Sequence, residues 1–133
     1  MTNVLVTNSG AGSNTSGGGM QVRDGSIIGL CTSCRFTNSL GQGGVFLNAG
    51  SQITFANTVV DGSFTQGLFA TGSGTRATLT GGSVINTRRD AANQGGFGLN
   101  SQSGASINCS GVSLSSNAAG NIFTSGGGST TGC

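Results

Sequence analysis

Short runs of alternating apolar residues recur about once every two dozen residues along the chain, and most follow a glycine. Each run places apolar side chains two positions apart, which puts them on one face of a β-strand. The pairs that we match in successive repeats are Met20 and Val22, Val45 and Leu47, Leu68 and Ala70, Phe97 and Leu99, and Ile122 and Thr124. No segment keeps the 3.6-residue period of an amphipathic helix, so the pattern predicts an all-β fold.

Two further alternating runs follow the first one in each repeat. The second strands are predicted at Ile28/Leu30, Ile53/Phe55, Ala77/Leu79 and Ile107/Cys109, with a last one that ends at Cys133. The third strands are predicted at Cys34/Phe36, Thr58/Val60, Gly82/Val84 and Val112/Leu114. Repeats too short to bury a core alone stack on one another, so the chain is expected to form one domain over residues 1–133. Three strands in each coil describe a three-sided parallel β-helix.

Turn-forming residues come where the third strand ends. They are Asn8, Asn38, Asp61-Gly62, Asn86 and Asn117. Asn, Asp and Gly tolerate the left-handed backbone conformation that a sharp corner requires. We therefore expect a column of left-handed corner residues along the stack.

Three short motifs resemble the coils of known proteins. They are the Gly-Gly-apolar strand, the Ile-Thr-Phe and Ala-Thr-Leu-Thr strands, and the Phe-Thr-Asn ending at Phe36 to Asn38. They are similar to coils of right-handed β-helices in bacterial autotransporter passengers and polymorphic outer-membrane proteins. The resemblance implies a right-handed parallel β-helix, or solenoid. The repeat spacing predicts about five coils of 23–29 residues, with three short strands per coil. The resemblance also implies a location at a cell surface.

The first and last strands of the chain belong to different sides of a coil. Val4 and Val6 match the third strand of later repeats, whereas the last run, up to Cys133, matches a second strand. A following subunit could supply the missing side, and a contact between two different ends that does not close makes a filament. The junction residues we expect are Val4, Leu5, Val6, Ile122, Phe123 and Cys133. A segment of a longer β-helix and a capped monomer are the alternatives.

The four cysteines are disulfide candidates. Cys109 and Cys133 lie in one column of the predicted stack, where strands are roughly 4.8 Å apart, within the Cα range that a disulfide spans. We expect Cys133 to form a disulfide, either with Cys109 or across the junction with Cys31 or Cys34. The Cys31-x-x-Cys34 spacing also occurs in zinc sites, but the chain has no His, so no metal is expected. Four cysteines in a chain of low charge indicate an oxidising compartment.

Charged residues are few: Lys and Arg number 5, Asp and Glu number 3, and the net charge is +2. General acid–base chemistry usually recruits His, Glu, Asp or Lys, and of these the chain holds only Asp24, Asp61 and Asp90, at different places in their repeats. We therefore predict that the protein is not an enzyme and uses no cofactor. The weak charge predicts no nucleic-acid partner, and the lack of a long apolar run predicts no membrane insertion.

A column of outward residues follows from the predicted inward positions Val45, Leu68, Phe97 and Ile122. It contains Phe46, Phe69, Gly98 and Phe123. Exposed apolar columns mark contacts, so the three phenylalanines are candidates for lateral bundling, for covering by a loop, or for holding a ligand.

The sequence predicts a structural role. We expect a subunit of an extracellular or cell-surface fibre or matrix that polymerises head to tail by β-strand addition, so that the β-helix continues between subunits. The alternative is a surface adhesin or a phage-fibre-like segment that binds glycans.

Overall fold

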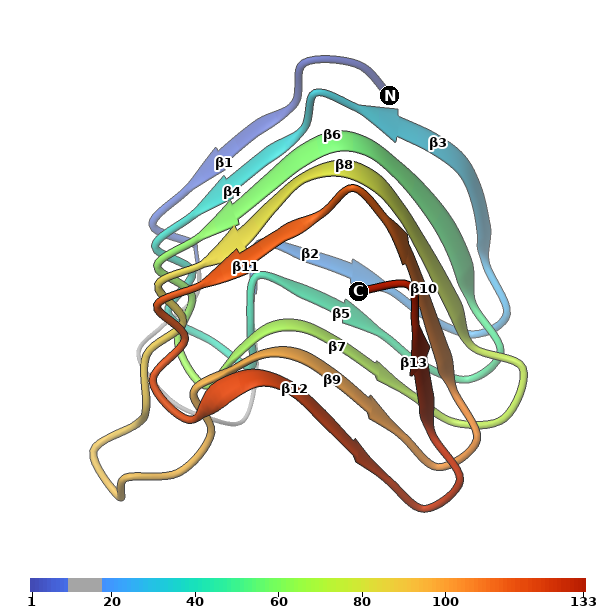
Figure 1. The fold of residues 1–133 in the computed structure, drawn as a ribbon. Helices are drawn as coiled ribbons and strands as arrows, with labels where there is room; N and C mark the ends of the chain where they lie inside the picture. Colours follow the sequence, from blue (N-terminus) through green and yellow to red (C-terminus); the bar gives the residue numbers. More distant parts are fainter. Residues whose placement is uncertain (10–17) are drawn as a thin grey trace.

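The computed structural model describes residues 1–9 and 18–133, and every regular element within them is a β-strand. Figure 1 shows how these strands lie side by side. The strands are β1 (Leu5–Thr7), β2 (Met20–Val22), β3 (Ile27–Thr32), β4 (Arg35–Thr37), β5 (Val45–Leu47), β6 (Gln52–Asp61), β7 (Gln66–Thr71), β8 (Arg76–Ile85), β9 (Phe97–Gln102), β10 (Ser106–Ser110), β11 (Ser113–Ser115), β12 (Gly120–Ser125) and β13 (Ser129–Thr131).

The strands form two sheets in which the paired strands run parallel. A 5-stranded sheet has the order β12-β9-β7-β5-β2, and an 8-stranded sheet follows β1-β4-β6-β8-β10-β13 with β3 beside β6 and β11 beside β8. The larger sheet bends within β6 and β8 (Figure 1). The first halves of these two strands pair with β3 and β10, and their second halves pair with β4 and β11. We therefore distinguish three ladders of paired strands and call them together the stack.

Each ladder contains one segment from each passage of the chain. The first ladder is β2, β5, β7, β9 and β12. The second is β3, the first halves of β6 and β8, β10 and β13. The third is β1, β4, the second halves of β6 and β8, and β11. The predicted third strand near Val4 and the predicted second strand near Ser129 thus lie in the ladders that the sequence indicated.

Left-handed residues make the corners between ladders. One column bends the chain from the second ladder into the third: Asn3, Ser33, Asn57, Gly81 and Gly111. Another lies after the third ladder: Asn8, Asn38, Gly62, Asn86 and Ser116. The prediction of Asn117 in this column was wrong, because Ser116 has the positive φ of 55°. Asn117 instead donates a side-chain hydrogen bond to the Val84 carbonyl and accepts one from the Thr87 amide.

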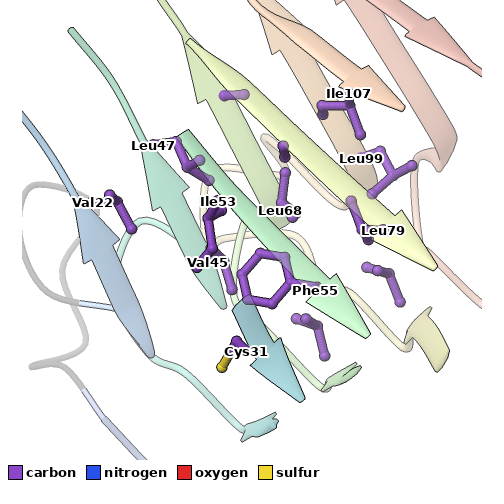
Figure 2. Packing of buried hydrophobic residues seen from close by; sticks show 14 of the residues in the cluster. Val22, Cys31, Val45, Leu47, Ile53, Phe55, Leu68, Leu79, Leu99 and Ile107 are labelled. Atoms are coloured by element: carbon purple, nitrogen blue, oxygen red, sulfur yellow. The ribbon is translucent and has the colours of Figure 1, made fainter. Parts of the chain in front are cut away.

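The hydrophobic core fills the space between the ladders (Figure 2). In the third ladder, Val6, Phe36, Val60, Val84 and Leu114 form one inward column. Phe36 packs edge-on against Phe55 of the second ladder, with the ring centroids 6.3 Å apart. Such close packing fixes which residue of each strand faces inward.

One strand register differs from the prediction. Leu99, not Phe97, lies opposite Leu68. Gly98 continues a column of glycines whose backbones approach so closely that a Cβ on Gly67 would lie 2.5 Å from the Gly98 carbonyl oxygen. Because Gly98 aligns with Gly67, Phe97 lies opposite Gln66 instead of Leu68. The Phe97 ring stacks on Phe123, with the ring centroids 4.8 Å apart.

A bulge changes the inward residue of β3. The pairing with β6 shifts between Ile28 and Cys31, so Cys31 rather than Leu30 lies opposite Phe55. Leu30 is 47% exposed, whereas Cys31 is fully buried. The expectation that Leu30 faces the core was therefore wrong, because a bulge adds one residue to the strand and reverses the faces beyond it.

Candidate functional site at the ends of the stack

Each end of the stack has open strand edges. At one end, which we call the first end, the outermost strands are β1, β2 and β3, and at the last end they are β11, β12 and β13. Among the described residues, each of these six strands pairs with another strand on one side only, and residues 1–3 bridge to the end of β3 on its second side. An open edge presents unpaired backbone N–H and C=O groups, to which another strand can add.

The β1 edge carries the junction residues that the sequence proposed at the start of the chain. The Val4 carbonyl accepts a hydrogen bond from the Arg35 amide, and the Asn8 amide donates to the Thr37 carbonyl. Alternate residues of a parallel strand bond to opposite neighbours, so the backbone groups of Leu5 and Thr7 point away from β4. The Leu5 side chain alternates with the half-buried Val4 and Val6, lies on the outer face of the sheet and is exposed.

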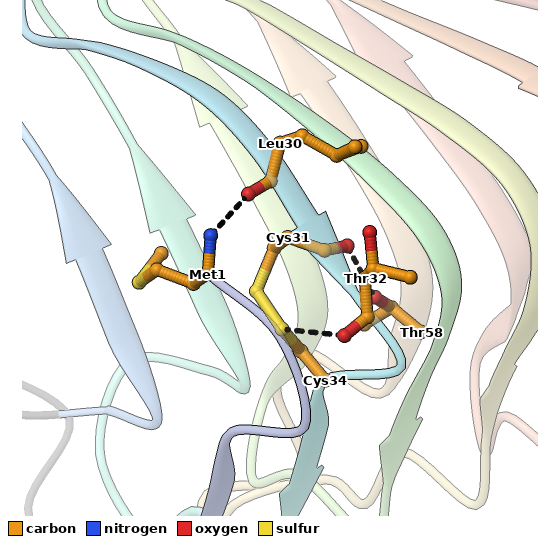
Figure 3. The surroundings of a disulfide bond; sticks show 6 residues. All are labelled: Met1, Leu30, Cys31, Thr32, Cys34 and Thr58. Atoms are coloured by element: carbon orange, nitrogen blue, oxygen red, sulfur yellow. Dashed lines mark hydrogen bonds between the residues drawn. A yellow bond between two sulfur atoms is a disulfide. The ribbon is translucent and has the colours of Figure 1, made fainter.

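The first three residues lie along part of the β3 edge. Thr2 forms a parallel bridge with Thr32, and the Met1 amino group donates to the Leu30 carbonyl at 2.7 Å (Figure 3). The start of β3 remains open, and Ile27 there is 74% exposed. The first end therefore offers both backbone groups and apolar side chains.

The β11 edge is the counterpart at the last end. The Ser115 carbonyl accepts from the Asn86 amide, so by the same alternation the backbone groups of Leu114 point to the open side. The side-chain amide of Asn121 donates to the Leu114 carbonyl at 3.2 Å. The sequence reasoning matched Leu114 with Val6 but did not include Leu114 or Asn121 in the junction. The sequence pattern could have indicated Leu114 as a junction residue, because Leu114 is the last apolar residue of its column.

Apolar residues are partly exposed at both ends of the core. The inner members of the columns are buried, whereas the residues packed against the core at its margins are half-buried: Val4, Val6, Met20 and Ile28 at the first end, and Cys109, Val112 and Leu114 at the last. Ile122 and Phe123 of β12 are 41% and 37% exposed. The candidate junction residues thus lie at two opposite ends of the stack and do not meet within one chain.

Both cysteine pairs form disulfides. Cys133 is bonded to Cys109, with the Cα atoms 4.8 Å apart, and Cys31 is bonded to Cys34 (Figure 3). No cysteine in the described part of the chain is free. The described residues contain no group of three or more His, Cys, Asp or Glu side chains suited to a metal ion. Two disulfides indicate an oxidising environment.

The column of outward side chains on the first ladder differs in one residue from the column that the sequence predicted. Asn100, not Gly98, stands between Phe69 and Phe123 in the outward column. Phe46 is 7% exposed, because the Phe69 ring packs against it and the Arg23 guanidinium lies 5.3 Å from its centroid.

The arrangement defines an all-β protein of parallel ladders with two open ends. Comparisons with known protein families, with curated proteins and with solved structures give no match to this chain. The part of the chain that the structure describes contains no helix with the length and hydrophobicity needed to cross a lipid bilayer.

Proposed function

We propose that the chain is a right-handed parallel β-helix of about five coils, and that it polymerises head to tail into an extracellular fibre or matrix. Parallel strands joined by a crossover are almost always connected with a right-handed sense, which supports the handedness. The observation that carries the proposal is the match between the two ends of the stack. Each end presents the same three ladders, open on opposite sides, and in the third ladder the half-exposed core residues Val6 and Leu114 lie in the same column.

The proposed junction continues each ladder into the next subunit. β1, β2 and the open start of β3 of the next subunit add to β11, β12 and β13, respectively. Extending the observed register places that subunit's Val6 opposite Leu114 and its Met20 opposite Ile122. Both side chains of each pair belong to inward columns, so the apolar core continues across the junction in the first and third ladders.

The hydrogen-bonding groups at the β1 and β11 edges are also complementary. In a parallel ladder the Leu114 N–H donates to the Leu5 carbonyl of the next subunit, and the Leu114 carbonyl accepts from that subunit's Thr7 N–H. These are the groups that face the open sides of the two edges. Each backbone hydrogen bond contributes about 1 kcal/mol net, and each half-exposed aliphatic side chain that becomes buried contributes on the order of 1 kcal/mol.

The junction uses two different surfaces, so its geometry leads to an open chain of subunits. A heterologous contact whose rotation does not close into a ring continues indefinitely. An extracellular location fits the two disulfides. The proposed partner is another copy of the same chain. The outward face of the first ladder is the proposed surface for lateral bundling of fibres.

Electron microscopy of the purified full-length chain tests the proposal. We expect long unbranched threads in negative stain, and we expect deletion of residues 2–8, which removes β1, to abolish them. Circular dichroism of the deleted chain must still report β-structure, so that loss of threads is not loss of folding. Discrete particles at every concentration of the intact chain would overturn the proposal.

A further inference from the structure

A groove of about 200 Å³ lies on the side of the stack, away from both ends. Its residues come from three consecutive parts of the chain: Gln42 before β5, Thr65, Gln66 and Phe69 at and within β7, and Asp90 and Gln94 in the loop after β8. This loop protrudes from the stack in Figure 1 and forms one wall of the groove.

The loop that forms the wall is held by hydrogen bonds. Arg89 and Gly95 form an antiparallel bridge, and the Asp90 amide donates to the Gln94 carbonyl at 2.9 Å. The Gln94 amide in turn donates to the Asp90 carboxylate at 2.8 Å. The Arg88 guanidinium donates to the Gly62 carbonyl and fixes the base of the loop. The groove is therefore largely pre-formed, which lowers the entropic cost of holding a ligand.

Thr65 at the edge of the groove has a strained backbone. Its φ is 65°, a left-handed value that a β-branched residue rarely adopts. The Gln66 amide donates to the Phe64 carbonyl at 2.9 Å, so the chain makes a three-residue γ-turn around Thr65. Strained backbone conformations of this kind are concentrated at active sites and ligand-binding sites.

The groove combines one aromatic ring with neutral polar groups. Gln42, Gln66 and Gln94 carry side-chain amides, Thr65 carries a hydroxyl, and Phe69 carries the ring. The Gln66 side-chain oxygen is buried and has no hydrogen-bond partner among the described residues. Buried polar atoms are nearly always paired, so this oxygen can gain a donor when the Gln66 side chain turns toward a ligand in the groove.

We propose that this groove binds a neutral sugar ring, such as a hexose or N-acetylhexosamine unit of a glycan. A sugar hydroxyl both donates and accepts, so it pairs with either end of an amide, and the apolar face of the ring packs on Phe69. The Asp90 carboxylate, which already accepts from the Gln94 amide, has further lone pairs that accept from a sugar hydroxyl. The volume holds one ring. The site lies outside the proposed junction, so it is present in the single subunit and along a fibre.

Saturation-transfer NMR with glucose, galactose, mannose and N-acetylglucosamine tests this site, because the method reads the ligand and works with a monomer or a fibre. We expect one of these sugars to bind with a Kd of roughly 1 mM, which is typical of a small ligand with few contacts. Phe69→Ala and Gln94→Ala should each weaken binding at least tenfold.

Gln21→Ala is the matched control. Gln21 is an exposed glutamine in the same outward column as Phe69, two strands away, and it does not line the groove. Its substitution should leave the saturation signal unchanged. Gln94 is exposed, so its variant separates loss of binding from loss of folding. No signal with any of the four sugars at 50-fold the expected Kd, or a signal that both groove variants retain, would overturn the inference.

Discussion

Cys133 is bonded to Cys109, one strand away, and the 4.8 Å between their Cα atoms equals the spacing of neighbouring strands in a sheet. The bond closes a loop with a sequence separation of 24 residues and attaches the outermost strand β13 to β10. Without it, the edge strand is held by a short ladder and by the Thr131–Asn108 side-chain hydrogen bond. The bond therefore determines how firmly the last end of the stack is formed.

Replacing both cysteines, as Cys109→Ser with Cys133→Ser, should lower the free energy of unfolding by roughly 3 kcal/mol, because the unfolded chain regains the entropy of the open loop. Urea denaturation measures this change, and hydrogen exchange should show faster exchange in β13 than in β6. Thr131→Ala is the control, since it keeps the disulfide and should cost less than about 1 kcal/mol. Equal stability of the double variant and the parent chain would contradict the prediction.

Three glycines differ in the two reasons why a position can require glycine, which are a close neighbouring atom and a positive φ. A Cβ on Gly82 would lie 2.0 Å from the Thr58 carbonyl oxygen, and its φ is +84°. Gly111 also has a positive φ, +64°, but has no atom within 4 Å of that position. Gly29 has neither a positive φ nor a nearby atom.

We therefore expect a graded series of stabilities. Gly29→Ala should be within about 0.5 kcal/mol of the parent chain, and Gly111→Ala should lose about 1 kcal/mol through left-handed strain. Gly82→Ala should lose more than about 3 kcal/mol, because the β6–β8 ladder must separate to admit the methyl group. Thermal or urea unfolding measures all three variants. If Gly82→Ala were as stable as Gly111→Ala, the close pairing at that corner would be wrong.

Phe55 and Phe123 differ in burial, so their replacement by alanine should cost different amounts of stability. Phe55 is 1% exposed and packs against Phe36, whereas Phe123 is 37% exposed. Phe55→Ala should lower the free energy of unfolding by about 3–5 kcal/mol through lost burial and a cavity. Phe123→Ala should lower it by about 1–2 kcal/mol in the monomer, because the ring stacks on Phe97 but is partly in solvent already. Similar losses for the two variants would contradict the observed difference in burial.

Periodicity predicted the ladders because a side chain in a strand faces in or out by simple alternation. Val60, Val84 and Leu114 lie in one column, as their spacing indicated. The same rule placed Val4 and Val6 in the third ladder, where β1 pairs with β4. Long-range pairing therefore followed from local pattern wherever the strand was regular.

Irregular residues limited the prediction. A bulge in β3 moves Cys31 into the core in place of Leu30, and nothing in the apolar pattern distinguishes these two neighbours. In β9 the apolar pattern matched Phe97 with Leu68, whereas the close backbone contact at Gly98 places Leu99 opposite Leu68. The groove near Thr65 depends on a turn conformation and on a loop from the next repeat. Such contacts arise only when the chain is folded.

Leu5→Pro distinguishes strand addition at β1 from other modes of assembly. The backbone groups of Leu5 point away from β4, so proline at this position leaves the hydrogen bonds to β4 in place. It removes the N–H that faces the open edge and puts the pyrrolidine ring where a neighbouring strand would lie. The monomer should keep its stability to within about 1 kcal/mol.

The concentration needed for threads should rise at least tenfold for Leu5→Pro, which corresponds to about 1.4 kcal/mol of junction energy. Val6→Pro gives the contrasting case, because Val6 lies opposite Phe36 with its backbone directed to β4. That variant should lose stability in the monomer as well, since it removes an existing ladder bond and a half-buried core side chain. Sedimentation at several concentrations, with urea unfolding of the same samples, separates the two effects. Threads that form from Leu5→Pro at the parent concentration would show that subunits join by a surface other than the β1 edge.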